Sequence, residues 1–243
     1  MPFLKKVLKD FLLRRDYVVN RPPGQFNVEA WKYKSLSKRG VGISSAIDGG
    51  AANGEWSRMF RSVFPDAKIL CVEPREDAYL SLAKWASQEK GISVAQVLLG
   101  PDSKNVEFND SGVQSSVLNF AGGREFGKRS ISRMTSLDAL VAEKSFQAPD
   151  LIKLDLQGYE LSALEGATKC VKACKYIQIE VSLFQFQDNQ PIFVDIVDYM
   201  EGIGFRLYDI LALWQRPLDG ALGQGDFLFV AKNSPLIKSN EWG

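Results

Sequence analysis

The sequence contains no histidine among its 243 residues. This absence excludes Ser-His and Cys-His catalysis, zinc sites with histidine ligands, and any imidazole acting as a base. The chemistry of the protein must therefore rely on carboxylates, lysine, tyrosine, a metal ion held by oxygen atoms, or the positioning of reactants.

Cysteine is also scarce, with three residues in the chain. Cys71 lies in an apolar run that is typical of a core strand. Cys170 and Cys174 are one helical turn apart, a spacing that can hold a metal ion, but the chain lacks the thiol and imidazole ligands that would complete such a site. We therefore expect structural cysteines, no metal site and a reducing, cytoplasmic environment.

Neither sign of charge predominates, because 30 Lys and Arg residues face 29 Asp and Glu residues. The formal net charge of +1 provides no long-range field for nucleic acid or for acidic partners. Long hydrophobic runs are missing too, since none reaches the roughly 18–20 residues of a membrane span. We therefore expect a soluble protein that does not bind nucleic acid.

Residues 1–15 combine apolar and basic side chains at helical spacing, and no small-residue cleavage site follows them. One interpretation is weak contact with an anionic membrane surface. The other, which the sequence favours, is docking on the domain or on a second subunit of a dimer. Residues 21–24, Arg-Pro-Pro-Gly, end this segment. We divide the chain into an N-terminal helical extension, residues 1–39, and one domain, residues 40–243.

Beyond residue 40, segments of strand and helix periodicity alternate with short connections. This alternation is typical of a Rossmann-like α/β fold, with a mostly parallel seven-stranded sheet and helices on both faces. A Gly- and Pro-rich loop over residues 217–225 predicts an antiparallel hairpin at one edge of the sheet. Residues 104–135 carry short β-prone pieces between turns. Strands are expected over 45–48, 68–73, 92–99, 151–155, 176–183, 205–211 and 227–231, and helices over 27–39, 55–64, 75–89, 136–143, 160–171 and 191–202.

The first candidate site is a small-residue loop, AIDGGAANGEWS, over residues 46–57. An apolar strand ends at Asp48, and the loop opens a helix whose first N–H groups are unpaired. A nucleotide-like ligand fits at the carboxyl end of such a strand. The NAD fingerprint G-x-G-x-x-G is not met, because Ala51 stands where the middle glycine would approach a pyrophosphate. S-adenosylmethionine has no pyrophosphate, and its amino and sulfonium groups suit an acid such as Asp48.

Two further strands end in an acid. Glu73, followed by Pro74, ends the second strand, where a carboxylate can accept hydrogen bonds from ribose hydroxyls. Asp155 ends a later strand, shortly before a helix that Glu160 opens. Three acids at one edge of a parallel sheet define a site. Glu160 by itself is also explained by the helix dipole, which stabilises an acid in the first turn.

Together these motifs resemble the FkbM-type methyltransferase family. The segment from Asp48 to Ser57 is similar to its first motif, D-x-G-A-x-x-G-x-x-S. The segment from Lys153 to Ala167 is similar to its later motif, K-x-D-x-E-G-x-E followed by L-x-G-A. The likeness covers roughly residues 40–232. One departure is Gln157, which stands where the family usually has glutamate and so removes a carboxylate from this edge of the sheet.

The resemblance implies a class I methyltransferase fold, S-adenosylmethionine as cofactor, and methylation of a hydroxyl oxygen on a sugar, glycan or other small-molecule acceptor. Candidate bases are Asp155 first, then Glu180 and Glu160. The loops over residues 100–135 are expected to hold the acceptor, with Ser115 and Ser116 near the mouth of the site. The expected cofactor-binding residues are Asp48, Gly49, Gly50, Ala51, Asn53, Gly54, Ser57, Glu73, Pro74, Leu99, Gly100 and Asp155.

Two other classes of function stay open. One is an NAD-dependent oxidoreductase or epimerase, although the middle glycine is missing and no Tyr-x-x-x-Lys pair can be placed. The other is a nucleotide-binding module without catalysis, which predicts cofactor binding without turnover. The intact loop, Glu73 and Asp155 argue against that second alternative.

Overall fold

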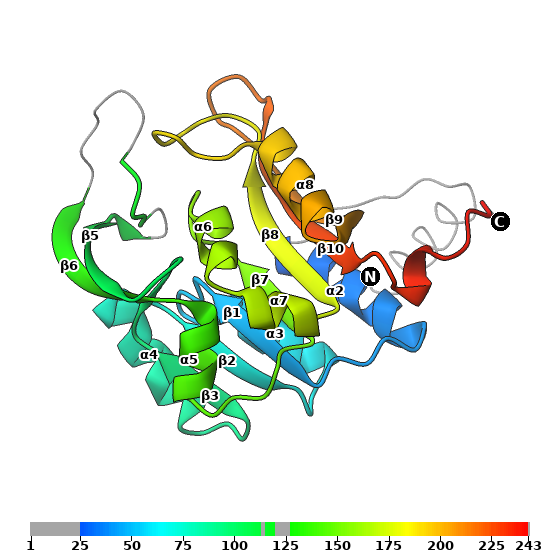
Figure 1. Cartoon of the computed structure of the whole chain (residues 1–243), viewed down its shortest axis with the longest axis horizontal. Helices are drawn as coiled ribbons and strands as arrows, with labels where there is room; N and C mark the ends of the chain where they lie inside the picture. The colour runs from blue at the N-terminus through cyan, green and yellow to red at the C-terminus, as the bar shows by residue number, and fades with distance from the viewer. Residues whose placement is uncertain (1–24, 113–114, 120–126, 243) are drawn as a thin grey trace, which may run out of the picture.

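The computed structural model describes residues 25–112, 115–119 and 127–242 of the chain. Strands and helices alternate along most of this part, and helices cover both faces of one large sheet (Figure 1). The expected helix over residues 1–15 lies outside the described residues. The strands are β1 (Ser45–Gly49), β2 (Lys68–Val72), β3 (Ile92–Ala95), β4 (Leu98–Leu99), β5 (Lys104–Asp110), β6 (Lys128–Thr135), β7 (Leu151–Leu154), β8 (Tyr176–Ser182), β9 (Phe205–Gln215) and β10 (Leu222–Ala231). The helices are α2 (Gln25–Lys38), α3 (Glu55–Val63), α4 (Glu76–Ala86), α5 (Leu137–Glu143), α6 (Glu160–Glu165), α7 (Thr168–Ala173), α8 (Phe193–Gly202) and the 3-10 turn η2 (Pro235–Ile237).

The main sheet has seven strands in the order β3-β2-β1-β7-β8-β10-β9. Within this order, the five neighbouring strands β3, β2, β1, β7 and β8 pair in parallel. Strand β10 runs antiparallel to both β8 and β9. This confirms the predicted mostly parallel sheet with an antiparallel hairpin at one edge. The hairpin is longer than expected, because β8 and β9 both pair with the glycine-rich start of β10 and hold it as strand.

Two apolar cores lie on the two faces of this sheet. On one face, α5, α6, α7 and α8 pack on strand side chains such as Ile47, Ile152 and Ile179. On the other face, α2, α3 and α4 pack on alternate strand residues such as Ala46 and Leu151. Successive strand residues point to opposite layers, so the continuous apolar runs of the parallel strands are buried on both sides.

The segment predicted as one strand over residues 92–99 is divided between two sheets. β3 pairs with β2, whereas Leu98 and Leu99 form β4 and pair with β6. Strands β4, β6 and β5 make a small second sheet, whose β5–β6 ribbon curves away from the main one (Figure 1). The chain leaves the main sheet here because Leu98, Phe108 and Met134 bury one another in a separate apolar cluster.

The helix predicted over residues 160–171 is two helices, α6 and α7, separated at Gly166. A Cβ on Gly166 would collide with the carbonyl oxygen of Gly100, so the chain passes close to the loop after β4. The carboxylate of Asp138 then stabilises the first turn of α7 by accepting a hydrogen bond from the backbone N–H of Lys169 at 2.8 Å.

Cys71, Cys170 and Cys174 are buried and unpaired, in agreement with a structural role. Throughout the described ranges, no helix combines the length and the apolarity that crossing a bilayer requires.

Buried polar side chains join α2 to α3 and the sheet. Glu29 is completely buried, and its Oε1 accepts hydrogen bonds from Trp56 Nε1 at 2.8 Å and Gln178 Nε2 at 2.7 Å. Tyr33, also completely buried, donates its hydroxyl to Gln178 Oε1. Glu29 Oε2 has no hydrogen-bond partner among the described residues. Burial raises the pKa of Glu29 to about 7, although its hydrogen bonds act to lower it.

Replacing Glu29 with glutamine is expected to stabilise the protein at alkaline pH. The folded state raises the pKa of Glu29 from 4.5 to about 7, so it favours the protonated carboxyl. This contribution to stability is complete below pH 4.5 and is lost as the pH rises through about 7. The amide stays neutral, so we expect urea unfolding to show the variant about 1–3 kcal/mol more stable than wild type at pH 8, and similar to it near pH 4.

Glu76→Gln, on the exposed side of α4, is the matched control for this comparison. It should unfold like the wild type at both pH values. A Glu29→Gln protein that is less stable than wild type at pH 8 would contradict the prediction.

Candidate active site

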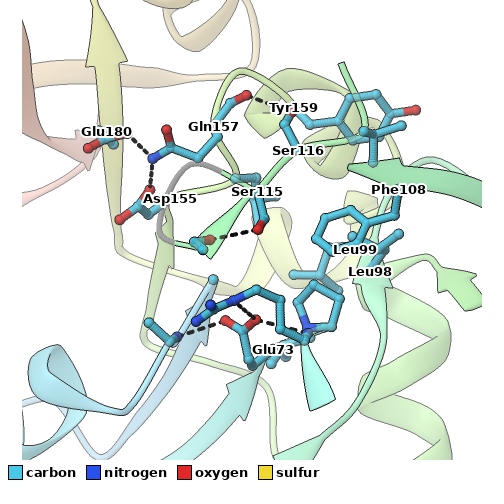
Figure 2. Close-up of a pocket in the computed structure, with 18 of the residues that line it drawn as sticks. Glu73, Leu98, Leu99, Phe108, Ser115, Ser116, Asp155, Gln157, Tyr159 and Glu180 are labelled. Carbon is cyan, nitrogen blue, oxygen red and sulfur yellow. Dashed lines mark hydrogen bonds and ion pairs between the residues drawn. The ribbon is translucent and has the colours of Figure 1, made fainter. Parts of the chain in front are cut away.

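A cleft of about 520 Å³ opens at the carboxyl ends of β1, β2, β7 and β8 (Figure 2). Small-molecule sites typically measure about 300–1,000 Å³, so the cleft can hold a nucleoside-sized ligand. Its lining residues are Gly50, Ala52, Asn53, Glu55, Val72, Glu73, Pro74, Arg75, Val97, Leu98, Leu99, Phe108, Gly112, Ser115, Ser116, Val117, Asp155, Leu156, Gln157, Tyr159, Glu180, Trp214 and Gln224.

The loop after β1 brings three strand ends together. Gly50 has a φ of 74°, and a Cβ there would collide with the carbonyl oxygen of Asp155. The backbone N–H groups of Gly50 and Ala51 each donate to the carbonyl oxygen of Val72 at 3.0 Å. Small residues therefore let the ends of β1, β2 and β7 meet at the cleft.

Glu73 follows β2 and is almost completely buried. Its Oε2 accepts a hydrogen bond from the backbone N–H of Ala52 at 2.8 Å, and its Oε1 accepts one from the backbone N–H of Arg75 at 3.0 Å. The Arg75 guanidinium also contacts Oε1, at 3.3 Å. Burial raises the pKa of Glu73, opposed by these hydrogen bonds. The bonds fix the carboxylate at the cleft, and Oε2, which accepts a single hydrogen bond, keeps a lone pair for a ligand hydroxyl.

Apolar side chains from the second sheet form the wall next to Glu73. Leu98 and Leu99 from β4 and Phe108 from β5 lie side by side there, as Figure 2 shows. Val72 and Val97 extend the same wall. A planar, apolar-faced group such as a nucleobase suits this surface.

Two carboxyl groups and two amides lie together elsewhere on the cleft wall. Gln157 Nε2 donates to Asp155 Oδ1 at 2.8 Å and to Glu180 Oε2 at 2.7 Å (Figure 2). Gln224 Nε2 lies 3.3 Å from Glu180 Oε2. Burial, together with the neighbouring Asp155 carboxylate, raises the pKa of Glu180 well above its usual range. This end of the cleft is therefore polar and acidic.

Lys153 lies beneath these groups and is almost completely buried. Its Nζ is 3.2 Å from Asp48 Oδ1 and 3.6 Å from Asp155 Oδ2, and it donates to the carbonyl oxygen of Gly50 at 3.1 Å. Burial alone would lower the pKa of Lys153, but the carboxylates of Asp48 and Asp155 raise it above its ordinary value. The lysine therefore stays charged and compensates part of the negative charge of Asp48 and Asp155.

The structure brings half of the expected site residues to the cleft. Those that line it are Gly50, Asn53, Glu73, Pro74, Leu99, Asp155 and Glu180. Those that do not are Asp48, Gly49, Ala51, Gly54, Ser57, Gly100 and Glu160. Ser115 and Ser116, expected near the mouth of the site, also line the cleft.

Two of the residues away from the cleft have clear partners in the interior. Asp48 is completely buried and pairs with Lys153 and with Ser57, whose Oγ donates to Asp48 Oδ2 at 2.6 Å. Its carboxylate therefore does not face the cleft, where we expected it to meet the cations of the cofactor. Glu160 Oε1 accepts hydrogen bonds from the backbone N–H groups of Leu156 and Gly158. Glu160 thus holds the loop between β7 and α6.

Several cleft residues carry no local signal in the sequence. Trp214 and Gln224 reach the cleft from β9 and β10, strands that we did not connect with the site. Arg75 directly follows Pro74 and Tyr159 directly precedes Glu160, so their position next to expected site residues is the signal that could have found them. Phe108 lies within the segment expected to hold part of the pocket.

The fold and the cleft together define a class of protein. The sheet is mostly parallel, with one antiparallel strand inserted beside its edge, and an acid after β2 faces a nucleoside-sized cleft. These are the features of a class I S-adenosylmethionine-dependent methyltransferase. The chain belongs to the FkbM methyltransferase domain family, whose model matches residues 48–207. A search of curated proteins finds no match.

Solved structures share the fold at low sequence identity. The chain resembles the structure of a fibrillarin–Nop5p complex with a TM-score of 0.50 and 13% identity, over 83% of this chain and 82% of that one. The magnesium protoporphyrin IX methyltransferase of Synechocystis, solved with bound cofactor, has a TM-score of 0.49 and 10% identity, over 93% and 96% of the two chains. An rRNA methylase from Streptococcus thermophilus has a TM-score of 0.48 and 10% identity, over 88% and 98%.

S-adenosylmethionine is the cofactor of this family, and the cleft fits its parts. Glu73 offers carboxylate oxygens to a ribose, and the wall with Leu99 and Phe108 offers an apolar surface to an adenine ring. Asp155 offers negative charge for the cationic sulfonium, a group that S-adenosylhomocysteine lacks. Family membership also replaces the alternative of an NAD-dependent oxidoreductase.

Glu73→Ala is expected to weaken the binding of S-adenosylhomocysteine by about 10- to 100-fold. The variant loses a hydrogen bond from a ribose hydroxyl to a charged group, and one such bond contributes about 1.5–3 kcal/mol. Calorimetric titration measures the affinity, with Glu76→Ala, which is exposed on α4, as control. Equal affinity of Glu73→Ala and wild type would show that Glu73 is not the ribose ligand.

Proposed function

We propose that the protein transfers a methyl group from S-adenosylmethionine to a hydroxyl oxygen of a sugar, glycan or other small hydroxylated acceptor, with Asp155 as the base. The observation that carries this proposal is the group formed by Asp155, Gln157, Glu180 and Gln224 on the cleft wall. Carboxylates and amide oxygens accept hydrogen bonds from hydroxyl groups, and a carboxylate can also take the proton that a hydroxyl must lose.

The cofactor supplies a methyl group already activated on a sulfonium. The protein has to hold the acceptor oxygen close to that group and in line with it, and such positioning can contribute roughly 7–11 kcal/mol. A cleft closed on one side by apolar side chains and on another by fixed polar groups suits this task. The remaining chemistry is the removal of one proton from the acceptor hydroxyl.

Asp155 is better placed for that proton than Glu180. About one third of the Asp155 side chain is exposed, 33%, and it lines the cleft. Burial, together with the neighbouring Asp155 carboxylate, raises the pKa of Glu180 well above its usual range, which favours its protonated form. Lys153, on the interior side of Asp155, compensates part of the negative charge and leaves the outer side of the carboxyl to the acceptor.

The acceptor end of the cleft combines aromatic and polar groups. Trp214, which pairs with Gln224 across β9 and β10, lines it together with the amides of Gln157 and Gln224. A sugar ring presents an apolar face and an edge of hydroxyls, and aromatic side chains beside hydrogen-bonding groups match both. This composition supports a carbohydrate-like acceptor.

The test uses cofactor whose methyl group is labelled with carbon-13. The protein is incubated with a panel of monosaccharides, short glycans and hydroxylated small molecules, with amines and thiols as alternatives. The carbon-13 chemical shift of the product distinguishes a methyl group on oxygen from one on nitrogen or sulfur. We expect O-methyl products; transfer to amines or thiols, with the hydroxyl compounds untouched, would overturn the proposal.

A further inference from the structure

We propose that Gln157 is a positioning residue that joins Asp155 and Glu180 into one proton-sharing pair, in which Asp155 accepts a proton from the acceptor while Glu180 keeps its own. The reaction in which the pair acts rests on the proposed function. The pairing itself rests on the geometry of the three side chains, and it can be tested without any acceptor.

The bridge by a single nitrogen is the first observation. Gln157 Nε2 carries two hydrogens, and its two bonds, 2.8 Å to Asp155 Oδ1 and 2.7 Å to Glu180 Oε2, use both of them. The two carboxyl groups are thereby held on either side of one amide (Figure 2). A glutamate at this position has no N–H to donate, so it would add a third carboxyl group and remove both bonds.

The backbone of Gln157 is the second observation. Its φ of 51° is in the left-handed region, which costs energy for a residue with a Cβ and persists when the surroundings enforce it. Glu160 Oε1 accepts from the N–H groups on both sides of Gln157, and Ser116 Oγ donates to its carbonyl oxygen at 2.9 Å. Neighbouring elements therefore fix the direction in which the amide points.

The charges around the pair set its protonation. Lys153 on β7 faces Asp155, and it is itself shared with Asp48 on β1. Asp226 on β10 and Glu160 on α6 lie close enough to Glu180 to raise its pKa, in addition to burial and Asp155. Asp155 and Glu180 are both only partly buried, but two like charges that share one amide repel each other, and the one cation nearby is shared with Asp48, so ionising both is costly. One proton therefore stays with the pair, and the donors of Gln157 stabilise the one negative charge.

This arrangement divides the work between the two acids. Asp155 takes the hydroxyl proton as the new C–O bond forms and the bond from the methyl carbon to sulfur breaks. Glu180 keeps its proton throughout and supplies no charge of its own. The net charge of the pair then changes from minus one to zero in the reaction, rather than from minus two to minus one.

The test is a carbon-13 NMR titration of the side-chain carboxyl groups in the full chain without ligand, with signals assigned from Asp155→Asn and Glu180→Gln. In Gln157→Leu both carboxyls lose a donor to their ionised form, so both midpoints should rise, by about one pH unit or more. Gln224→Leu is the matched control, because Gln224 contacts Glu180 and not Asp155. It should raise the Glu180 midpoint less and leave that of Asp155 in place.

An Asp155 midpoint that is the same in Gln157→Leu and wild type would overturn the proposal. So would an equal displacement of both midpoints in Gln224→Leu. If Gln157→Leu does not fold, Gln157→Glu takes its place, and the added carboxyl should raise both midpoints; unchanged midpoints would again overturn the proposal. Once an acceptor is known, the acidic limb of the pH–rate profile should move with the Asp155 midpoint.

The two proposals fail in different ways. If the methyl group goes to nitrogen or sulfur, the NMR result still decides whether the pair exists. If the midpoints do not respond to Gln157, O-methyl transfer can still be observed in the panel of acceptors.

Discussion

Asp155→Asn is expected to slow methyl transfer to a hydroxyl acceptor by about 10²–10⁴-fold, the usual contribution of a general base. The asparagine oxygen can still accept the hydrogen bond from Gln157 Nε2, so the geometry of the cleft should persist. What is lost is the ability to take a proton. Initial rates with labelled cofactor measure the effect, using the acceptor found in the panel.

The affinity for S-adenosylhomocysteine should stay within a few-fold of wild type in this variant, because Glu73 and the apolar wall are untouched. Asp66→Asn, on the exposed turn between α3 and β2, is the control and should react at the wild-type rate. A variant of Asp155 that keeps full turnover with the true acceptor would exclude it as the base.

Lys153→Met is expected to lower the free energy of unfolding by about 3–5 kcal/mol, as is usual when one partner of a buried ion pair is removed. Asp48 is completely buried, and without the ammonium 3.2 Å from its Oδ1 its charge has no cation beside it. Asp155 also loses a nearby cation. Urea unfolding at pH 7, followed by circular dichroism, gives the change in stability.

A second substitution separates charge from packing. In Lys153→Met combined with Asp48→Asn the uncompensated charge is gone, so part of the lost stability should return. Lys84→Met, exposed on α4, changes the same residue type with no buried partner and should unfold like wild type. If the free energy of unfolding of Lys153→Met alone were within about 1 kcal/mol of the wild-type value, the loss would be smaller than a broken buried ion pair causes. That result would contradict this account.

The position of the cleft follows from the sequence because parallel strands end at a common edge. Glu73 and Asp155 each follow an apolar strand, and the rule that ligands bind beyond the carboxyl ends of such strands places both at one site. The structure brings them to the same cleft. Apolar runs and small-residue turns are local signals, and they predicted the strands that carry these two acids.

Other parts of the site depend on contacts between distant segments. Asp48 is also an acid at a strand end, yet its carboxylate is turned inward by Lys153, more than a hundred positions later in the chain. Hydrophobic periodicity is a local signal and does not predict an ion pair between such distant residues. Likewise, Trp214 and Gln224 reach the cleft through the register of β9 against β10. The sequence did not predict this register, because the glycine-rich start of β10 was interpreted as part of a loop.

The place of β10 in the sheet has a consequence for how the chain folds. β10 follows both β8 and β9 in the chain, yet it lies between them, so the β9 strand lacks its β10 partner until residues 222–231 have been synthesised. Until then the edge of β8 that will face β10 has unpaired backbone N–H and C=O groups, and such an edge can pair with strands of other chains. Completing the sheet thus requires β10 to enter between two earlier strands rather than to add at a free edge. Nascent or truncated chains that end before Leu222 should therefore aggregate, and a chaperone that shields β8 would raise the yield of native protein.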